Sequence, residues 1–222
     1  MKRKSIIYRK LKSRNLGSTK PVSRIFGIER GKAIDRYYIE KFLEENSHFI
    51  KGTVLEIGDR RYTKQFGGER VDKSYVLSRQ SSNSGVDFVA DLETGEEVPA
   101  EIADCFILVQ TLLCTFDVFS AAKNSLKPLK PGGVLLISVP GITQISQYDY
   151  ERWGQYWSFT DQSLIKIYQR LVPEENITIT TYGNVKAASA FLYGLSLDEL
   201  ELEDLEYRDR DYQLVITGII KR

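Results

Sequence analysis

The run Thr53-Val54-Leu55-Glu56-Ile57-Gly58 decides the fold class of this 222-residue sequence. It is short, rich in β-branched and apolar side chains, and ends on a glycine, which is typical of a strand followed by a turn. Two continuous apolar runs, 105–109 and 134–139, have the composition of strands that are buried on both faces. An amphipathic pattern over 118–129 lies between these two runs and predicts a helix. Strands that alternate with helices indicate βαβ units and an open parallel sheet, an α/β fold.

The alternation continues outward from this centre. Apolar residues at three- and four-residue spacing predict a helix over 32–50, directly before the first strand. Thr160 is a suitable N-cap for a second helix over 160–171. The remaining strands are expected at 71–77, 86–91, 177–182 and 212–220.

The charge of the chain is divided between two segments. The whole sequence has 31 basic and 30 acidic side chains, but residues 1–24 hold nine basic ones and no acidic one. We therefore expect a basic N-terminal tail over 1–28 and one domain over 29–222. Such a tail is either a poorly ordered end or an arm that touches anionic lipid, nucleic acid or a partner.

Hydropathy and composition restrict the class of protein. No stretch approaches the roughly 18 apolar residues of a transmembrane helix, and the N-terminus lacks the apolar core of a signal peptide. With 42% hydrophobic and 27% charged residues, the sequence is typical of a folded globular protein, which we expect in the cytoplasm.

Histidine and cysteine are too scarce for several kinds of active site. His48, Cys105 and Cys114 are the only residues of these two types in the sequence, and they are widely spaced. A zinc site normally needs three or four such ligands close together. A Ser-His-Asp or Cys-His site would need His48, which follows a polar helix end and is expected at the surface. Metal and thiol chemistry are therefore not predicted.

Ligands bind an open α/β sheet at the carboxyl ends of its strands. This rule selects Glu56 and Gly58 after the first strand, Asp91 after the third, and Gln110 after the fourth. Gly58 would let a ligand approach the backbone closely. Glu56 could equally brace the loop, Asp91 could form a turn, and Gln110 could cap a buried strand.

Four stretches in this order resemble class I S-adenosylmethionine-dependent methyltransferases of the type 11-like kind. The run 54–58 is similar to their first motif, and Asp91-Leu92 to the pair that contacts adenine. The run 104–112 is similar to their fourth strand, and 129–136 to the turn that leads into the fifth. The resemblance implies a Rossmann-like seven-stranded sheet, mostly parallel with an antiparallel last strand and helices on both faces. It also implies S-adenosylmethionine as cofactor, held by Glu56, Gly58, Asp91, Leu92 and Gln110. We also place Asp59 and Tyr75 at the cofactor, where Tyr75 could stack on the adenosine or simply fill space.

Three further stretches resemble a bacterial subgroup associated with surface-polysaccharide biosynthesis. These stretches are 35–43, 153–160 and 181–185, and the resemblance covers about 29–222. The subgroup implies O-methylation of a sugar or glycan intermediate.

The sequence departs from the family pattern at two places. Asp59-Arg60-Arg61-Tyr62 stands where the family usually has further glycines, and Tyr75 stands where we place the acid at the end of the second strand. These departures favour an alternative, a methyltransferase-like domain that has lost catalysis and acts as a binding or scaffold module. A dinucleotide oxidoreductase would need a G-x-G-x-x-G loop, which is absent. An RNA methyltransferase would use the basic tail to hold phosphates.

The segment 147–157 is the densest aromatic stretch of the sequence. It follows the fifth strand and is therefore expected to overhang the ligand edge of the sheet. Aromatic faces beside charged groups suit a ring-bearing acceptor, although the two tryptophans could instead pack the segment onto the domain. We expect Asp149 and Glu151 as candidate catalytic bases, and Tyr150, Arg152, Trp153, Tyr156 and Trp157 as acceptor-binding residues.

Overall fold

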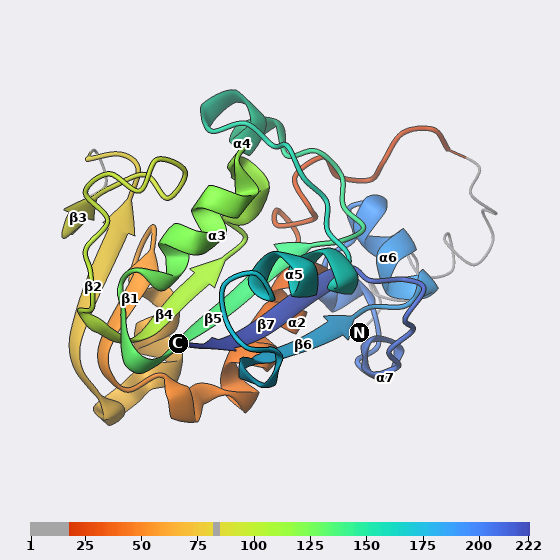
Figure 1. Cartoon of the computed structure of the whole chain (residues 1–222). Coiled ribbons are helices and arrows are strands. Elements are labelled where there is room, and N and C mark those ends of the chain that lie inside the picture. The colour runs from red at the N-terminus through yellow and green to blue at the C-terminus, as the bar shows by residue number, and fades with distance from the viewer. Residues whose placement is uncertain (1–17, 82–84) are drawn as a thin grey trace.

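A computed structural model of the chain describes residues 18–81 and 85–222. Within these residues, seven strands form one sheet in the order β3-β2-β1-β4-β5-β7-β6 (Figure 1). The strands β1, β2, β3, β4 and β5 pair in parallel, and β7 is antiparallel to both β5 and β6. The expected seven-stranded, mostly parallel sheet with an antiparallel last strand is confirmed. The strands are β1 Gly52–Ile57, β2 Val71–Ser78, β3 Phe88–Val89, β4 Ala103–Val109, β5 Leu129–Pro140, β6 Ile177–Tyr182 and β7 Val215–Lys221.

The sheet is buried on both faces, as the apolar runs predict. In β4, Phe106 and Leu108 belong to one hydrophobic core, whereas Cys105 and Ile107 belong to the other. Consecutive side chains of a strand point to opposite faces, so one continuous apolar run supplies both cores. Because both faces are apolar, polar groups can gather only at the ends of the strands.

Helices cover both faces of the sheet (Figure 1). Side chains of α3 and α5 contribute to the core that contains Phe106, and side chains of α2 and α6 to the core that contains Ile107. Within the described residues, no helix combines the length and hydropathy needed to cross a bilayer. The helices are α2 Ile34–Glu45, α3 Val118–Leu126, α4 Gln147–Arg152, α5 Asp161–Tyr168, α6 Val185–Leu192 and α7 Glu203–Glu206, with short turns of 3-10 or π type between them.

Local capping explains where several helices begin. The Asp117 side chain accepts a hydrogen bond from the Ser120 amide at the start of α3, and Thr160 forms a capping box with Ser163 at the start of α5. Asn184 accepts from two amides at the start of α6. The Ser146 side chain caps α4 in the same way.

Several predicted boundaries need correction. Helix α3 ends at Leu126, and β5 already begins at Leu129, because Leu129 pairs with Ala103 of β4. Strand β3 has two residues where six were expected. The short helix α4 lies inside the predicted aromatic loop. Helix α6 was not among the predicted helices, and it begins at the Asn184 cap.

Candidate functional site

A cavity of about 570 Å³ opens at the carboxyl ends of the parallel strands. Its floor includes Gly58 after β1, Gln110 after β4 and Pro140 at the end of β5. Its walls come from the N-terminal segment before α2 and from the segment after β5. The volume lies in the range of small-molecule sites in proteins. Of the predicted site residues, Glu56, Gly58, Asp59, Gln110 and Asp149 line this cavity.

Glu56 has the loop-bracing role that its position allowed. Its carboxylate accepts hydrogen bonds from the amides of Tyr62 at 2.9 Å and Thr63 at 2.7 Å, and from the Thr63 hydroxyl at 2.7 Å. Burial raises the pKa of Glu56, although these hydrogen bonds act to lower it. Both oxygens are therefore occupied, and they hold the turn that follows β1 against the strand.

Gly58 presents bare backbone to the cavity. Its φ angle is +83°, and a side chain built there would meet no atom within 4 Å. The backbone is held in place because its amide donates to the Leu77 carbonyl of β2 at 2.9 Å. The turn therefore leaves open the space that a close-lying ligand would need.

The bulky residues after Gly58 do not fill this space. Arg60 turns to the neighbouring loop, where it donates to the Gly85 carbonyl and pairs with Asp87. Tyr62 is 6% exposed, belongs to the core and contributes to the cavity lining from its side. Asp59 is exposed at the rim and accepts from the Arg61 amide.

Gln110 holds a strained backbone at the centre of the site. It directly follows β4 and has φ of +48°, a conformation that non-glycine residues adopt infrequently. Its amide donates to the Ser138 carbonyl of β5 at 2.9 Å, which fixes the turn. Strain of this kind is found where a site needs a side chain in a set place.

Asp35 and Arg36, at the start of α2, line the cavity and were not among the predicted site residues. The Asp35 side chain is 16% exposed, and its Oδ1 atom is buried without a hydrogen-bond partner. Burial raises the pKa of Asp35, against the lowering effect of the nearby Arg36 charge. A buried, unpartnered carboxylate oxygen is costly, which makes this residue a candidate for ligand binding.

The Arg36 guanidinium lies among several groups of the cavity. It donates to the Tyr62 hydroxyl at 3.0 Å, while its Nε atom is 3.9 Å from Asp35 Oδ2. Burial acts to lower the pKa of Arg36, and the charges of Asp35, Tyr62 and Asp149 more than offset this effect. Arg36 is thus an electrostatic link between α2, the turn after β1 and α4.

Arg36 is also the cation best placed to meet a ligand. Among the described residues that line the cavity, the other two cations are Lys32 and Arg61, and both pair with Glu40 of α2. In the sequence, Asp35 and Arg36 begin the stretch 35–43 of the subgroup resemblance, which assigned them no role at the site. Their role depends on where α2 begins relative to the sheet, which no local pattern contains.

The segment after β5 supplies the opposite wall. Asp149, in α4, lines the cavity together with Ser146 and Gln155. The Gln155 side chain accepts from the Ser146 amide at 2.8 Å and donates to the Gln144 carbonyl at 3.4 Å. These contacts hold α4 over the cavity. Glu151, the other predicted base, is exposed and does not line the cavity.

The predicted position of Tyr75 is wrong. Strand β2 continues to Ser78, so Tyr75 lies in mid-strand, away from the carboxyl edge. Its ring packs edge-on against Phe88 at 5.3 Å between centroids. Tyr75 is therefore part of the core packing, and the residues at the strand end are Ser78 and Arg79.

Asp91 and Leu92 also lie outside the cavity. Asp91 accepts two hydrogen bonds from the Arg79 guanidinium, at 3.0 and 2.7 Å, and Arg79 also donates to the Cys114 carbonyl. Leu92 is 3% exposed and belongs to the core. At this part of the sheet edge, an ion pair occupies the carboxylate that was expected to meet a ligand.

The aromatic side chains of the segment 147–157 face outward rather than into the cavity. Tyr156 packs against Phe116 at 5.5 Å between ring centroids, and Trp157 donates to the Thr115 carbonyl at 2.9 Å. Trp153 packs edge-on against Tyr148. The predicted acceptor-binding residues Tyr150, Arg152, Trp153, Tyr156 and Trp157 therefore do not line the cavity.

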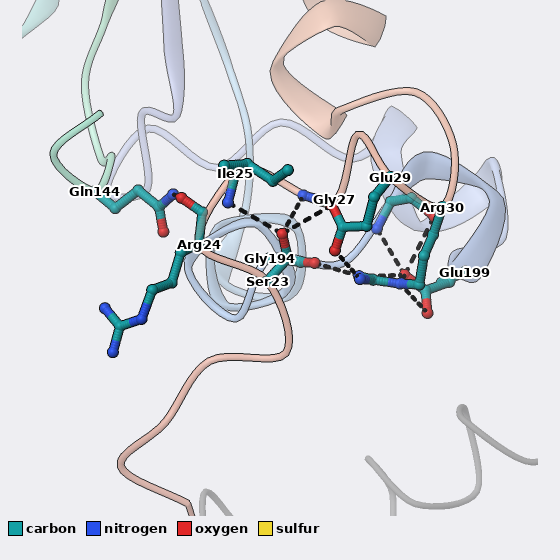
Figure 2. A network of polar contacts seen from close by, with 10 residues as sticks. Ser23, Arg24, Ile25, Gly27, Glu29, Arg30, Gln144, Gly194 and Glu199 are labelled. Atoms are coloured by element: carbon teal, nitrogen blue, oxygen red, sulfur yellow. Dashed lines mark hydrogen bonds and ion pairs between the residues drawn. The ribbon is translucent and has the colours of Figure 1, made fainter. Parts of the chain in front are cut away.

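Residues 18–28, the described part of the predicted tail, pack on the domain, and Phe26 and Ile28 line the cavity. Figure 2 shows the polar contacts that hold this segment. Ser23 accepts from the amides of Ile25 and Gly27 and donates to Glu29, while the Arg24 carbonyl accepts from the Gln144 side chain at 2.9 Å.

The same segment is fixed to the region after α6. Arg30 donates to both oxygens of Glu199 and to the Gly194 carbonyl. Phe26 stacks on Phe191 at 5.3 Å between ring centroids. We call residues 22–33 the strap, because they form one wall of the cavity and are held at both ends.

Comparison with solved structures identifies the fold. No protein-family model matches this sequence, and no curated protein matches it. A SAM-dependent methyltransferase from Archaeoglobus fulgidus superposes with a TM-score of 0.54 at 12% identity, over 84% of this chain and 94% of that one. The N-methyltransferase NodS from Bradyrhizobium japonicum, in complex with S-adenosyl-L-homocysteine, superposes with a TM-score of 0.53 at 16% identity, over 96% and 97%.

The same fold also occurs in a protein with a different reaction. The [4+2]-cyclase SpnF superposes with a TM-score of 0.52 at 16% identity, over 86% of this chain and 84% of that one. At such identities the likeness establishes the fold, which is that of class I SAM-dependent methyltransferases. The reaction has to be argued from the cavity itself.

Proposed function

We propose that this chain binds S-adenosylmethionine in the cavity and transfers its methyl group to a small acceptor. The observation that carries the proposal is Gly58, whose open backbone faces the cavity at the end of the first strand. Gln110 on the neighbouring strand supplies a fixed polar side chain at the same edge. When bound, the cofactor would supply an activated methyl group on a sulfonium sulfur.

The cavity suits the charged amino-acid end of this cofactor. Among the described residues Arg36 has only a long ion pair, 3.9 Å to Asp35, and it would hold the carboxylate of the methionine part. Asp35 would accept a hydrogen bond from the ammonium group through its carboxylate, whose Oδ1 atom has no hydrogen-bond partner within the described part of the protein. Arg36 and Asp35 together therefore fit the carboxylate and the ammonium group of the methionine part.

We propose a sugar or glycan hydroxyl as the methyl acceptor, as the subgroup resemblance implies, with the reaction in the cytoplasm. Asp149 lines the cavity and would take the proton that the hydroxyl loses. Ser146 and Gln155 beside it would supply further hydrogen-bonding groups. The main contribution of the protein would be alignment of the acceptor with the methyl group.

Calorimetric titration tests the cofactor. We expect S-adenosylmethionine and S-adenosylhomocysteine to bind the wild-type chain, and NAD⁺ not to bind. Arg36→Met should weaken S-adenosylhomocysteine binding about tenfold or more, through loss of a charge-assisted contact. Arg61→Met is the matched control, because Arg61 also lines the cavity but pairs with Glu40. Absence of binding by either adenosyl compound at about millimolar concentration, a weak limit for a specific site, would refute the proposal.

The second candidate is a domain that binds a ligand without catalysis. The ion pair between Arg79 and Asp91 favours it, because it occupies the carboxylate expected to contact the cofactor. Arg79→Ala distinguishes the two. If S-adenosylhomocysteine binds only to this variant, the wild-type chain is a module that has lost the cofactor. If the wild-type chain and the Arg79→Ala variant bind S-adenosylhomocysteine with equal affinity, the ion pair lies outside the ligand site.

A further inference from the structure

Exposed apolar side chains of three segments lie near the carboxyl edge of the sheet, at which the cavity opens. Three segments, 22–28, 116–119 and 145–157, carry most of the large exposed hydrophobic side chains of the described chain. Scattered single exposed hydrophobic residues are ordinary, but a gathering on one face marks an interaction site. We call this gathering the mouth surface. It consists of Val22, Ile25, Ile28, Phe116, Phe119, Ile145, Tyr148, Tyr150, Tyr156 and Trp157, which are 39–67% exposed.

Direct contacts join the three segments into one surface. The Gln144 side chain donates to the Arg24 carbonyl, which ties the loop before α4 to the strap. Tyr156 packs on Phe116, and the Trp157 side chain donates to the Thr115 carbonyl. In Figure 1 the strap, α4 and the start of α3 all lie along the carboxyl edge of the sheet.

The cations beside this surface are available to a partner. Lys20 and Arg24 are exposed, and neither forms an ion pair with any other described residue. Figure 2 shows the Arg24 guanidinium pointing away from the network that holds its backbone. Residues 1–17, which lie outside the described residues, add seven basic side chains and no acidic one to the sequence.

We propose that the mouth surface docks on an anionic lipid bilayer. Apolar side chains flanked by Lys and Arg are what an interfacial protein presents to a membrane, because the apolar groups enter the headgroup region while the cations meet anionic lipids. Four of the side chains, Val22, Ile25, Ile28 and Ile145, are aliphatic. The other six are aromatic, and rings with a polar end, as in Tyr and Trp, suit the interface between lipid and water. The four aliphatic side chains offer no flat face for a base to stack on, which favours lipid over single-stranded nucleic acid.

Docking in this orientation places the cavity mouth against the bilayer. Phe26 and Ile28 of the strap, and Ser146 before α4, belong both to the cavity wall and to segments of the mouth surface. An acceptor carried by a lipid would then reach the cavity without crossing water. The docking itself does not depend on the proposed methyl transfer, and the experiment below measures it without cofactor.

Co-sedimentation with vesicles tests the docking. The full chain should sediment with phosphatidylcholine vesicles that contain about one third phosphatidylglycerol, and not with pure phosphatidylcholine, and added salt should release it. Lys20→Glu with Arg24→Glu should weaken this binding about tenfold or more, since each cation near an anionic surface contributes. Lys51→Glu with Arg70→Glu makes the same change in net charge at the amino edge of the sheet and should have little effect.

A second pair of variants tests the apolar contribution. Ile25→Ser with Phe116→Ser should also weaken binding about tenfold, in proportion to the apolar area removed. Leu202→Ser with Tyr207→Ser alters side chains that are equally exposed, outside the mouth surface, and should bind as the wild type does. All four variants change exposed residues, and each is first checked for wild-type thermal unfolding.

Intrinsic fluorescence gives a readout that needs no variant. The only two tryptophans of the sequence, Trp153 and Trp157, lie in this region, so vesicle binding should shift their emission to shorter wavelength. Three results would overturn the proposal. These are no sedimentation with anionic vesicles, equal loss in the control variants, or release of the bound chain by a 20-nucleotide RNA whose own binding requires Arg24 and Phe116.

Discussion

At the scale of single residues, the site combines a turn without a side chain at Gly58 with a carboxylate, that of Asp35, which lacks a hydrogen-bond partner at one oxygen within the described chain. Gly58 and Gln110 hold left-handed backbone at the ends of two neighbouring strands, and Asp35 keeps a buried oxygen without a partner. The left-handed backbone of Gln110 and the unpartnered Asp35 oxygen each cost stability, and neither contributes to the packing of the core. Their common position around one cavity is the reason to assign them to ligand binding.

Gly58→Ala should separate the effect on the ligand from the effect on the fold. The φ of +83° should cost the variant about 1 kcal/mol of unfolding free energy, and the added methyl group should also enter the cavity. Gly132→Ala is the matched control, since Gly132 has φ of +77° and equally open surroundings at the other end of the sheet. Calorimetry with S-adenosylhomocysteine should show weaker binding for Gly58→Ala alone. Equal affinities would mean that the ligand does not approach this turn.

Asp35→Asn should change how stability depends on pH. Because burial raises the pKa of Asp35 in the folded chain, the folded state binds this proton more tightly than the unfolded state. The contribution of this carboxyl group to stability is present below its unfolded pKa and is lost as pH rises through its folded pKa. The variant should therefore be more stable than the wild type at neutral pH, by about 1 kcal/mol, and this gain should shrink in acid.

Urea unfolding at several pH values measures the Asp35 effect. The exposed Asp72 provides the control through Asp72→Asn, which should give a nearly constant, small difference. If the difference in unfolding free energy between Asp35→Asn and the wild type stays constant with pH, burial does not raise the pKa of this carboxyl group.

At the scale of elements, the strap is the part of the chain whose placement completes the cavity. Its left-handed Phe26 and Gly27 turn the chain sharply, and a side chain at Gly27 would meet backbone atoms of Leu195 and Ser196 at 2.8 Å. This close approach lets Phe26 stack on Phe191 while Ile28 reaches the cavity. The strap is therefore a fixed wall built on the segment after α6.

Arg30→Met should loosen the strap without unfolding the domain. The substitution removes the contacts to Glu199 and to the Gly194 carbonyl, which hold the middle of the strap. Amide hydrogen exchange over residues 22–33 should become about tenfold faster, because local opening no longer has to break these hydrogen bonds. Lys41→Met breaks a different ion pair, to Glu206, and should leave exchange in the strap unchanged. Unchanged exchange in Arg30→Met would mean that apolar contacts alone hold the strap.

At the scale of the whole molecule, stability depends on the last strand. Strand β7 lies between β5 and β6, so β7 must be in place before β6 can join the sheet. Ile216 and Ile220 of β7 join the core that contains Phe106, and Val215 joins the core that contains Ile107. The end of the sequence therefore closes both cores.

Ile216→Ala should destabilise the molecule far more than a substitution at the opposite edge. Ile216 is fully buried, and its truncation should cost about 3 kcal/mol of unfolding free energy. Val89 in the edge strand β3 is 47% exposed, and Val89→Ala should cost less than about 1 kcal/mol. Chemical denaturation monitored by circular dichroism measures both. Similar losses in the two variants would contradict the central role of β7.

The sequence by itself determined the sheet and the edge at which a ligand binds, because buried strands and capped helices leave local patterns. The runs at 54–58, 105–109 and 134–139 sufficed for the parallel core, and Gly58 and Gln110 followed from the strand ends. The errors at Tyr75 and in β3 arose because the end of a strand depends on its pairing partner.

Only the tertiary structure decided which side chains share the cavity. Asp35 and Arg36 precede Asp149 by more than 100 positions, and their charges act on one another only because α2 and α4 border the same opening. Arg79 reaches Asp91 because β2 and β3 are neighbours, and the aromatic residues after β5 turn outward because Phe116 and Thr115 offer them contacts. Such pairings follow from distances between segments, which the order of residues along a chain does not contain.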